Sequence, residues 1–348
     1  TLLRRVLMTG ELIKSHSMNF FFQVLPDLLN IFNNRQKITT PYDLINYDPQ
    51  ITTNIYELIK IGNEINNLFG GRSVHLISLI PGGVIYSPSK KNISTAKKKF
   101  QNALINLEWI IEKFIEIFSH QIPPEESNAP NLIYLGLSNS GNYNRYSGKL
   151  SLKDVNRNMI EFEKHNYSTY FGKEPDLCGI DYYFENRKNV IVGPFARYNI
   201  IENYGTDEIQ TYLKYFDKPW KNNLLFANFI RLLEMYIESI QSLEILDHDC
   251  LNTKQKIPAL NSVKNFDGIG IIEAPRGLLL HHYHLSNRNS IDRIKLFVAT
   301  EFNIPLINEM ITIYAKELFE RTGNINLVKN TIQRIIRIFD PCISCVTH

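Results

Sequence analysis

The sequence predicts a mainly helical α+β protein, and three observations support this fold class. Apolar residues recur at intervals of three and four over most of the 348 residues, which is the spacing of one helix face. Between roughly 131 and 200 the apolar runs become shorter and alternating, with Gly and Asn between them, which favours strands and hairpins. No internal repeat or long linker interrupts the chain. We therefore expect one domain over 1–348 with a β-rich insertion at 131–200.

Six segments have the helical spacing and together predict a helical core. They lie near 2–33, 51–69, 94–118, 222–246, 301–322 and 324–339. The last one should end at Asp340 because a proline follows, and the residue before a proline disfavours the helical conformation. The segment 121–130, QIPPEESNAP, is expected to be a surface connection. The alternating runs that predict strands are NLIYLGL, GKLSL, MIEFE and NVIVGPFARYNI.

Composition and charge exclude several classes of protein. The chain is 44% hydrophobic and 21% charged, which is typical of a globular protein. Its net charge of +3 is spread along the chain, and the one short basic run, at 97–100, falls inside a helical pattern, so we expect no nucleic-acid partner. No apolar stretch reaches the roughly 18 residues that a membrane span needs. Four cysteines and no secretory leader favour a reducing cytoplasm.

Both ends of the sequence carry information. The first residue is Thr1, and the residues after it already have the pattern of a helix interior without a capping residue. We expect that a segment upstream is missing. At the other end, Cys342 and Cys345 follow the last predicted helix, and His348 is the final residue.

The pair Cys342 and Cys345 has the spacing of a bidentate thiolate clamp for a soft or borderline metal. A structural zinc half-site, a redox dithiol and coincidence are alternatives. Zinc would need two more ligands, but Cys178 and Cys250 each stand alone. A thioredoxin-like dithiol would precede a helix, where the helix dipole stabilises the thiolate, whereas this pair follows one.

A second unusual stretch contains Glu273, Pro275, Arg276 and Gly277. A β-like apolar run ends at Glu273, and the proline and glycine on either side of Arg276 would hold its guanidinium at a rigid turn. An exposed arginine on an ordinary surface turn is the alternative. Three histidines follow, and they could bind a metal or simply be solvated. They are His281, His282 and His284.

Together, the E-A-P-R-G stretch and the terminal D-P-C-x-x-C-x-x-H resemble the two C-terminal signatures of nickel–iron hydrogenase large subunits. Further family motifs are matched in the same order, so the resemblance covers essentially the whole chain. These matches are Ser15-His16 with FFF and Pro26-Asp27, 70–75 with 81–83, 193–199, and 296–303. In sequence, these motifs most resemble those of the cytoplasmic cofactor-coupled branch, which includes the methyl-viologen-reducing and deazaflavin-reducing enzymes. The resemblance implies the helical core of that subunit and the reversible oxidation of dihydrogen.

One part of the family pattern is absent. The family holds nickel with four thiolates, two of them from an N-terminal R-x-C-G-x-C, and this sequence has only the C-terminal pair. We expect an N-terminally truncated sequence rather than a divergent enzyme. Smaller departures are Asn19, where the family often repeats a histidine, and Leu76, where it has proline.

The resemblance also implies residue roles. Cys342 would be a terminal nickel ligand, and Cys345 would bridge nickel to an iron that carries cyanide and carbon monoxide. Soft sulfur suits this task because it donates charge to nickel and can accept a proton beside it. Pro275 and Arg276 would line the pocket, with the guanidinium as base or electrostatic clamp. Thr300 would donate a hydrogen bond to a cyanide nitrogen.

A second divalent metal, Mg²⁺ or Fe²⁺, would be bound by the Leu296 carbonyl and the His348 imidazole. Whether a C-terminal extension is trimmed after His348 stays open. Electrons would leave through an iron–sulfur small subunit, because the chain has no cysteines left for a cluster. Further electron-transfer subunits, deazaflavin-, heterodisulfide- or nicotinamide-linked, would follow.

Two alternative functions share this fold. The quinone-reducing subunit of respiratory complex I resembles these proteins but has lost the cysteines, whereas Cys342, Cys345 and His348 are present here. A non-catalytic scaffold or hydrogen-sensing subunit would keep the same site at low turnover. The sequence leaves open the electron acceptor, the direction of catalysis, the oxygen tolerance and the oligomeric state.

Overall fold

The computed structural model divides the chain into two compact units. The first unit is Thr1–Gln121 with Arg231–Val263, and the second is Ile122–Ile230 with Lys264–His348. The residues that the structure describes are 2–32, 37–81, 83–85, 87–129, 131–154, 156, 158–173, 180–183, 189–252, 267–286, 290–342 and 345. The single-domain organisation expected over 1–348 stays a prediction.

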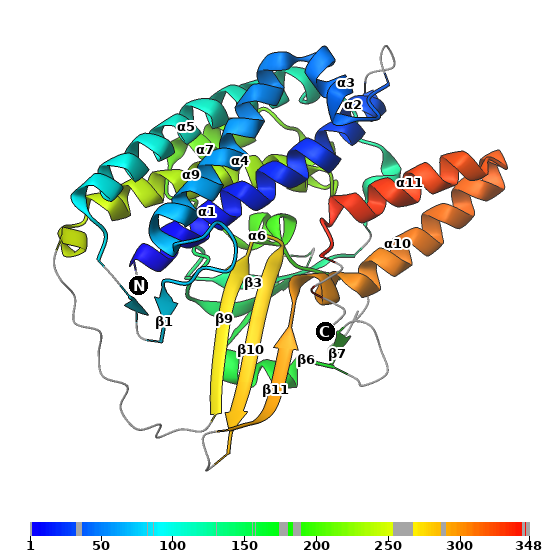
Figure 1. Ribbon diagram of the computed structural model, residues 1–348. Coiled ribbons are helices and arrows are strands. Elements are labelled where there is room, and N and C mark those ends of the chain that lie inside the picture. The colour runs from blue at the N-terminus through cyan, green and yellow to red at the C-terminus, as the bar shows by residue number, and fades with distance from the viewer. Residues whose placement is uncertain are drawn as a thin grey trace. The chain divides into compact units, whose positions relative to one another are not determined.

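The first unit is built mainly from helices. They are α1 (Leu2–Asn19), a π-helical segment (Phe20–Val24), α2 (Leu25–Phe32), α3 (Pro41–Tyr47), α4 (Pro49–Gly70), α5 (Lys90–Phe118) and most of α9 (Phe226–Asp247), followed by a 3-10 turn (Asp249–Asn252). Helix α4 packs against α1 on one side and against α5 on the other (Figure 1). The strands β1 (Leu79–Ile80) and β2 (Gly83–Val84) form a small antiparallel pair in the connection that follows α4.

The second unit contains two larger sheets. A four-stranded sheet has the order β5-β4-β3-β8 and a three-stranded sheet has the order β11-β10-β9. The first comprises β3 (Ile133–Ser138), β4 (Lys149–Asp154), β5 (Met159–Phe162) and β8 (Val190–Ile191), antiparallel except for β3 with β8. The second comprises β9 (Asp267–Ala274), β10 (Gly277–Leu285) and β11 (Ile291–Phe297). A two-stranded pair is formed by β6 (Phe171–Gly172) and β7 (Asp181–Tyr182).

Helices of the second unit connect and cover these sheets. They are the short α6 (Pro194–Ile200), α7 (Asp207–Leu213) and α8 (Lys218–Lys221), the long α10 (Ala299–Thr322) and α11 (Ile325–Ile338), and 3-10 turns at Glu125–Ser127 and Lys164–Thr169. The hydrophobic core of this unit joins both sheets to the start of α10. It includes the fully buried side chains of Leu135, Phe171, Leu278, Phe297 and Phe302.

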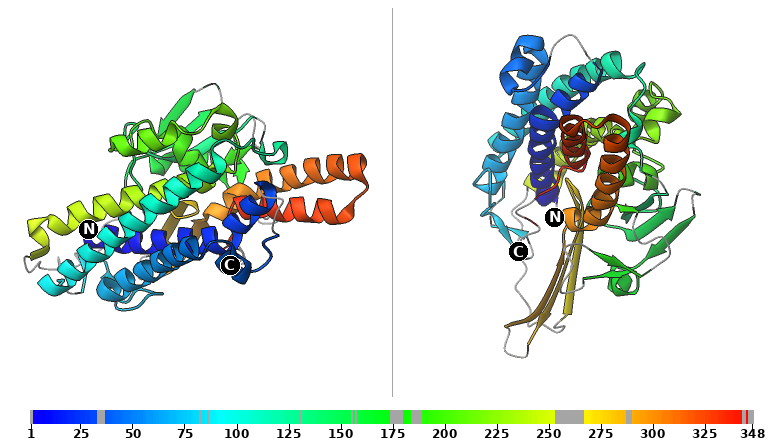
Figure 2. Two further views of the ribbon diagram at one scale, coloured as in Figure 1. Left: turned by 90° about the horizontal axis from the view of Figure 1, so that it is seen from above. Right: turned by 90° about the vertical axis from the view of Figure 1, so that its right-hand side faces the viewer.

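The helices α10 and α11 form a hairpin that returns the chain toward the candidate site (Figure 2). Gly323 ends α10 in the left-handed conformation at φ 62°, which a glycine adopts without steric cost. Asn324 then caps α11, because its side chain accepts hydrogen bonds from the amides of Asn326 and Leu327, both at 3.1 Å. The hairpin lets residues after α11 contact the first turn of α10.

All six predicted helical segments are confirmed, with small shifts of their ends. The expectation of a strand over the whole of NVIVGPFARYNI is wrong, because only Val190–Ile191 is a strand and Pro194–Ile200 is helix α6. Helix α6 begins at Pro194. Proline is favoured at the first helical position because no amide hydrogen bond is lost there. Among the described residues, no helix has both the length and the apolarity needed to cross a bilayer.

Candidate metal centre

Pro275 and Arg276 form the tip of the hairpin between β9 and β10. Ala274 and Gly277 face each other in the strand register, so only two residues make the turn. Behind the tip, Gly277 has a φ of 137° and Gly193, at the start of α6, has a φ of 102°. A Cβ on Gly193 would lie 2.7 Å from the Arg276 carbonyl oxygen. Glycine is therefore required here by both backbone conformation and close approach.

A buried ion pair supports the same hairpin. Arg197 on α6 donates from Nη1 to Oε2 of Glu273 at 2.8 Å, and the two side chains are 2% and 0% exposed. Arg197 also donates to the carbonyl oxygens of Ala274, at 3.3 Å, and Pro275, at 3.2 Å. The other carboxylate oxygen of Glu273 accepts from the amide of Leu137 at 2.9 Å. This network fixes the backbone that carries Arg276.

Arg276 contacts the chain just before the cysteine pair. Its Nε donates to the Asp340 carbonyl oxygen at 2.8 Å and lies 3.1 Å from the carboxylate Oδ2 of the same residue. Asp340, two residues after the end of α11, is buried and adopts a φ of 49°. The Arg276 side chain is 35% exposed. It is therefore a partly buried, charge-paired arginine, and not an isolated arginine on a surface turn.

Thr300, in the first turn of α10, contacts the cysteine segment directly. Its hydroxyl accepts a hydrogen bond from the amide of Cys342 at 3.0 Å. The residue is buried, and the hydroxyl hydrogen remains free to donate because a hydroxyl can accept and donate at once. Arg276, Thr300 and Cys342, from three separate stretches of sequence, are thereby brought together.

Cys342 and Cys345 are joined as a disulfide in the structure, with their Cα atoms 5.3 Å apart. The expectation of two free thiolates therefore does not describe this form. The reason is geometric: two cysteines that can direct their sulfurs at one metal also lie within the Cα separation that permits a disulfide. The amide of Cys345 donates to the Cys342 carbonyl at 3.2 Å, which folds the segment back on itself.

The predicted second metal site is placed only in part. Leu296 lies near the end of β11, opposite His281 in the register and four residues before Thr300. His348 lies outside the described residues. Within the described part of the chain, no group of three or more His, Cys, Asp or Glu side chains could hold a metal ion. Metal binding by Leu296 and His348 stays a prediction.

The three histidines of β10 take part in hydrogen bonds. His282 contacts the Tyr167 hydroxyl and the Asp267 carboxylate, both at 2.8 Å, and His284 lies 3.4 Å from the same carboxylate. The hydrogen bond from His282 holds the pKa of Asp267 below its usual value. Burial lowers the pKa of His281, so its ring favours the neutral form. The histidines are thus paired with protein groups.

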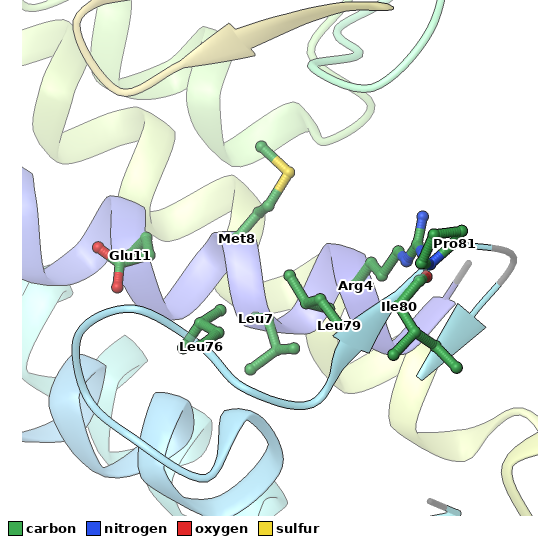
Figure 3. A pocket seen from close by; sticks show the side chains of 8 residues that line it. All are labelled: Arg4, Leu7, Met8, Glu11, Leu76, Leu79, Ile80 and Pro81. Carbon is green, nitrogen blue, oxygen red and sulfur yellow. The ribbon is translucent and has the colours of Figure 1, made fainter. Parts of the chain in front are cut away.

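The motifs near Ser15 and Gly70 lie in the first unit. His16, fully buried on α1, contacts the Glu234 carboxylate at 3.2 Å. The loop after α4 borders an apolar pocket of about 400 Å³, where Leu7, Leu76 and Leu79 gather beside α1 (Figure 3). Arg4 donates to the carbonyl oxygens of Ile80 and Gly83 and so fixes this loop.

Sequence reasoning missed three residues of the site: Arg197, Glu273 as an ion-pair partner, and Asp340. Arg197 stands in the quoted G-P-F-A-R-Y-N stretch and Asp340 in D-P-C, so both motifs were noticed but not these roles. The local sequence carried no signal for the pairing, because the partners are 76 and 64 positions apart.

Comparison with known proteins defines the class of protein. Residues 185–348 match the family model described as nickel-dependent hydrogenase. Over nearly its whole length the chain is similar to subunits of nickel-dependent hydrogenases, as the sequence motifs predicted.

Particular relatives include the beta subunit of the NAD-reducing hydrogenase HoxS of Cupriavidus necator, which is 27% identical over 99% of this chain and 75% of the relative. One component of the F420-non-reducing hydrogenase of Methanothermobacter marburgensis is also 27% identical, again over 99% of this chain and 75% of the relative. The crystal structure of an NAD⁺-reducing [NiFe]-hydrogenase in the H2-reduced state has a TM-score of 0.89 at 23% identity, over 100% of this chain and 80% of that one. This last likeness confirms the predicted fold.

Proposed function

We propose that the chain is the catalytic large subunit of a nickel–iron hydrogenase, which oxidises dihydrogen reversibly to two protons and two electrons. The observation that carries the proposal is the joining of the E-A-P-R-G turn to the D-P-C-I-S-C segment. Arg276 pairs with Asp340, two residues before Cys342, and Thr300 accepts from the Cys342 amide. Segments that are far apart in sequence thereby meet at the start of the cysteine segment.

The donor set of the site fits a nickel–iron centre in part. Cys342 and Cys345 already place two sulfur atoms at one point, and reduced thiolates are the ligands that soft metals prefer. Before metal binding, a dithiol reductant would have to supply two electrons to the disulfide, which would leave two thiolates as the reductant itself becomes a disulfide. The resemblance calls for two further thiolates from an R-x-C-G-x-C motif, which this sequence does not contain. When bound, the centre with its cyanide and carbon monoxide would supply heterolytic cleavage of dihydrogen.

The chain's own residues would then orient and stabilise charge. Asp340 holds the Arg276 guanidinium in one orientation, because Nε donates to its carbonyl oxygen at 2.8 Å and Nη2 donates to its Oδ1 at 3.3 Å. Nη1 is left to donate toward the centre. A fixed cation in a partly buried site stabilises developing negative charge without reorganisation. Thr300 would donate its free hydroxyl hydrogen to a cyanide nitrogen, and Pro275 would exclude water from that side.

A divalent Mg²⁺ or Fe²⁺ near the C-terminus, bound by the Leu296 carbonyl and His348, belongs to the same proposal. Electrons would pass to an iron–sulfur small subunit, and from it to a deazaflavin-, heterodisulfide- or nicotinamide-linked subunit. The two relatives described above support such an assembly, because each is named as one component of a larger hydrogenase. A cytoplasmic location also stays a prediction.

The experiment compares Arg276→Lys with the unchanged protein, purified without oxygen from the cells that make it, together with its copurifying subunits. Lysine keeps the charge but lacks the planar fork that pairs with Asp340. We expect equal nickel and iron content and a dihydrogen oxidation rate lower by about a hundredfold, equivalent to roughly 3 kcal/mol. Arg321→Lys, at an arginine whose side chain is 68% exposed, is the matched control and should keep full activity.

Equal metal content with near-equal activity in Arg276→Lys would contradict the role of the guanidinium. Loss of metal and activity together would show that Arg276 acts only in the architecture of the turn. Absence of dihydrogen turnover in the unchanged, metal-loaded protein would contradict the catalytic function and favour a sensing or scaffold role.

A further inference from the structure

The second unit contains a hollow of about 990 Å³ that none of the predicted metal-site residues lines, although Tyr198 and Asn199 belong to the matched stretch 193–199. Its walls come from the sheet strands β3, β4 and β5 and from helices α6, α7 and α8. This volume lies at the upper end of the range typical of small-molecule sites. The hollow is therefore large enough for a ligand of nucleotide size.

Four lysines gather around this hollow: Lys153, Lys214, Lys218 and Lys221. Lys153 lies near the end of β4, Lys214 directly follows α7, and Lys218 and Lys221 are the first and last residues of α8. Among the described residues, none of the four side-chain ammonium groups has a hydrogen-bond or ion-pair partner. Charges of one sign that converge without partners repel each other, so an anion in the hollow would be stabilised.

Two carboxylates reduce the positive charge without cancelling it. Asp154 and Glu202 also line the hollow, so four lysines and two carboxylates leave a net charge of +2. The Asp154 carboxylate is engaged already, because Asn158 donates to both of its oxygens at 2.9 Å, from its backbone amide and its side chain. The hollow thus matches a ligand that carries about two negative charges.

Aromatic and apolar surface lies beside the cations. Tyr134, Lys153 and Met159 are direct cross-strand neighbours on β3, β4 and β5, so their side chains share one face of the sheet. The Tyr134 ring is supported by Phe195, with centroids 6.1 Å apart. Such a face offers a platform for a planar ring next to the ammonium groups.

The tyrosine hydroxyls add hydrogen-bond donors. Burial and the neighbouring Tyr198 raise the pKa of Tyr134 to about 12, and burial raises the pKa of Tyr198. Both phenols are therefore protonated near neutral pH and can donate. Neither hydroxyl has a hydrogen-bond partner within the part of the chain that the structure describes.

We propose that this hollow binds a nucleotide-sized phosphate ester, with its phosphate among the lysines and its planar ring against Tyr134 and Met159. The proposal is independent of the nickel–iron centre, because no residue of that centre lines the hollow. A free phosphate ion and a nucleotide would both present phosphate to the lysines. The probes of the experiment below distinguish these two ligands.

The test is isothermal titration calorimetry of the full chain, with its copurifying subunits, against AMP, inorganic phosphate and adenosine. We expect AMP to bind, phosphate to bind at least tenfold more weakly, and adenosine to give no measurable binding. Raising the ionic strength should weaken AMP binding, because salt screens the lysines. The double variant Lys214→Gln/Lys218→Gln should lose at least tenfold in AMP affinity.

Matched variants separate binding from folding. Lys91→Gln/Lys98→Gln removes the same charge from positions on α5 outside the hollow and should bind AMP as the unchanged chain does. Tyr134→Phe keeps all charges and should lose about fivefold in affinity, the value of one hydrogen bond. Circular dichroism melting checks that each variant folds.

Several results would overturn the proposal. They are no binding of AMP or phosphate by the unchanged chain, equal AMP affinity in Lys214→Gln/Lys218→Gln, and adenosine that binds as tightly as AMP. Phosphate that binds as tightly as AMP would overturn the role of the aromatic platform.

Discussion

The buried pair of Arg197 and Glu273 gives the sharpest test of how the site is held. We consider Glu273→Gln, which keeps the size of the side chain and removes only its charge. The glutamine can still accept from the Leu137 amide, as one carboxylate oxygen does now at 2.9 Å. The guanidinium of Arg197, 2% exposed, loses its counter-charge.

The loss of stability expected in Glu273→Gln follows from the burial of the ion pair. Removal of one partner from a buried ion pair costs about 3–5 kcal/mol, because the remaining charge stays desolvated without that counter-charge. This is a large fraction of the roughly 5–15 kcal/mol by which a domain is stable. The control Glu126→Gln breaks the ion pair with Arg321, whose side chain is 68% exposed. It should cost less than about 1 kcal/mol, because solvent screens exposed pairs.

The assay is urea unfolding followed by tryptophan fluorescence. The chain has two tryptophans, and a Trp109→Phe background leaves only Trp220, which is fully buried in the second unit. The signal then reports the unit that contains the pair. Arg197→Met and the double variant complete a cycle, in which the double change should cost less than the sum of the two single changes.

A loss of unfolding free energy below about 1 kcal/mol in Glu273→Gln would contradict the predicted contribution of the buried pair. So would strict additivity in the cycle, since two groups that stabilise each other must be coupled.

Two further predictions concern hydrogen bonds near the site and at a helix start. Thr300→Val should speed hydrogen exchange of the Cys342 amide about fivefold or more, because that amide loses an acceptor at 3.0 Å. The control Thr312→Val changes an exposed hydroxyl of the same helix and should leave the exchange rate of the Cys342 amide unchanged. An unchanged exchange rate in Thr300→Val would contradict the hydrogen bond between Thr300 and the Cys342 amide. Hydrogen bonds from Thr39 and Thr40 lower the pKa of Asp43 from 3.8 to about 2. Because the pKa of Asp43 is lower in the folded chain, the ionised carboxylate stabilises α3 fully above about pH 3.8. This stabilisation is lost as the pH falls through about 2. Carboxyl NMR titration should show the lowered midpoint, and Thr39→Ala should raise it; a midpoint of 3.8 in the unchanged chain would contradict the prediction.

The helices were predictable because their signal is local. The spacing of apolar residues along α4, α5, α10 and α11 determines which face is buried, whatever the tertiary partners are. The helix α6 was missed because its seven residues are apolar on most sides, and a short apolar run does not distinguish a strand from a buried helix.

The sheet of β9, β10 and β11 was recognised only at the end of its first strand. In β10 the apolar run GLLL is followed by three histidines, which suggested an imidazole cluster and not a strand. The partners of these histidines, Tyr167 and Asp267, come from other segments. Their role as hydrogen-bonded strand residues depends on tertiary structure.

The candidate site was also predictable only in part from the sequence. Motif resemblance was sufficient to name Arg276, Thr300, Cys342 and Cys345, because each stands at a fixed place in a matched stretch. The ion pair of Arg276 with Asp340 requires the α10–α11 hairpin to bring the two segments together. No local pattern specifies that contact.

Nickel X-ray absorption tests the proposed ligation of nickel by Cys342 and Cys345 most directly, on the protein purified without oxygen together with its copurifying subunits. It compares the unchanged chain with Cys345→Ser, and with Cys250→Ser as the control at the one described cysteine outside the pair. We expect sulfur scatterers around nickel in the unchanged chain, and in Cys345→Ser either one sulfur fewer at equal nickel content or no bound nickel. An identical sulfur shell and identical nickel content in all three proteins would contradict it.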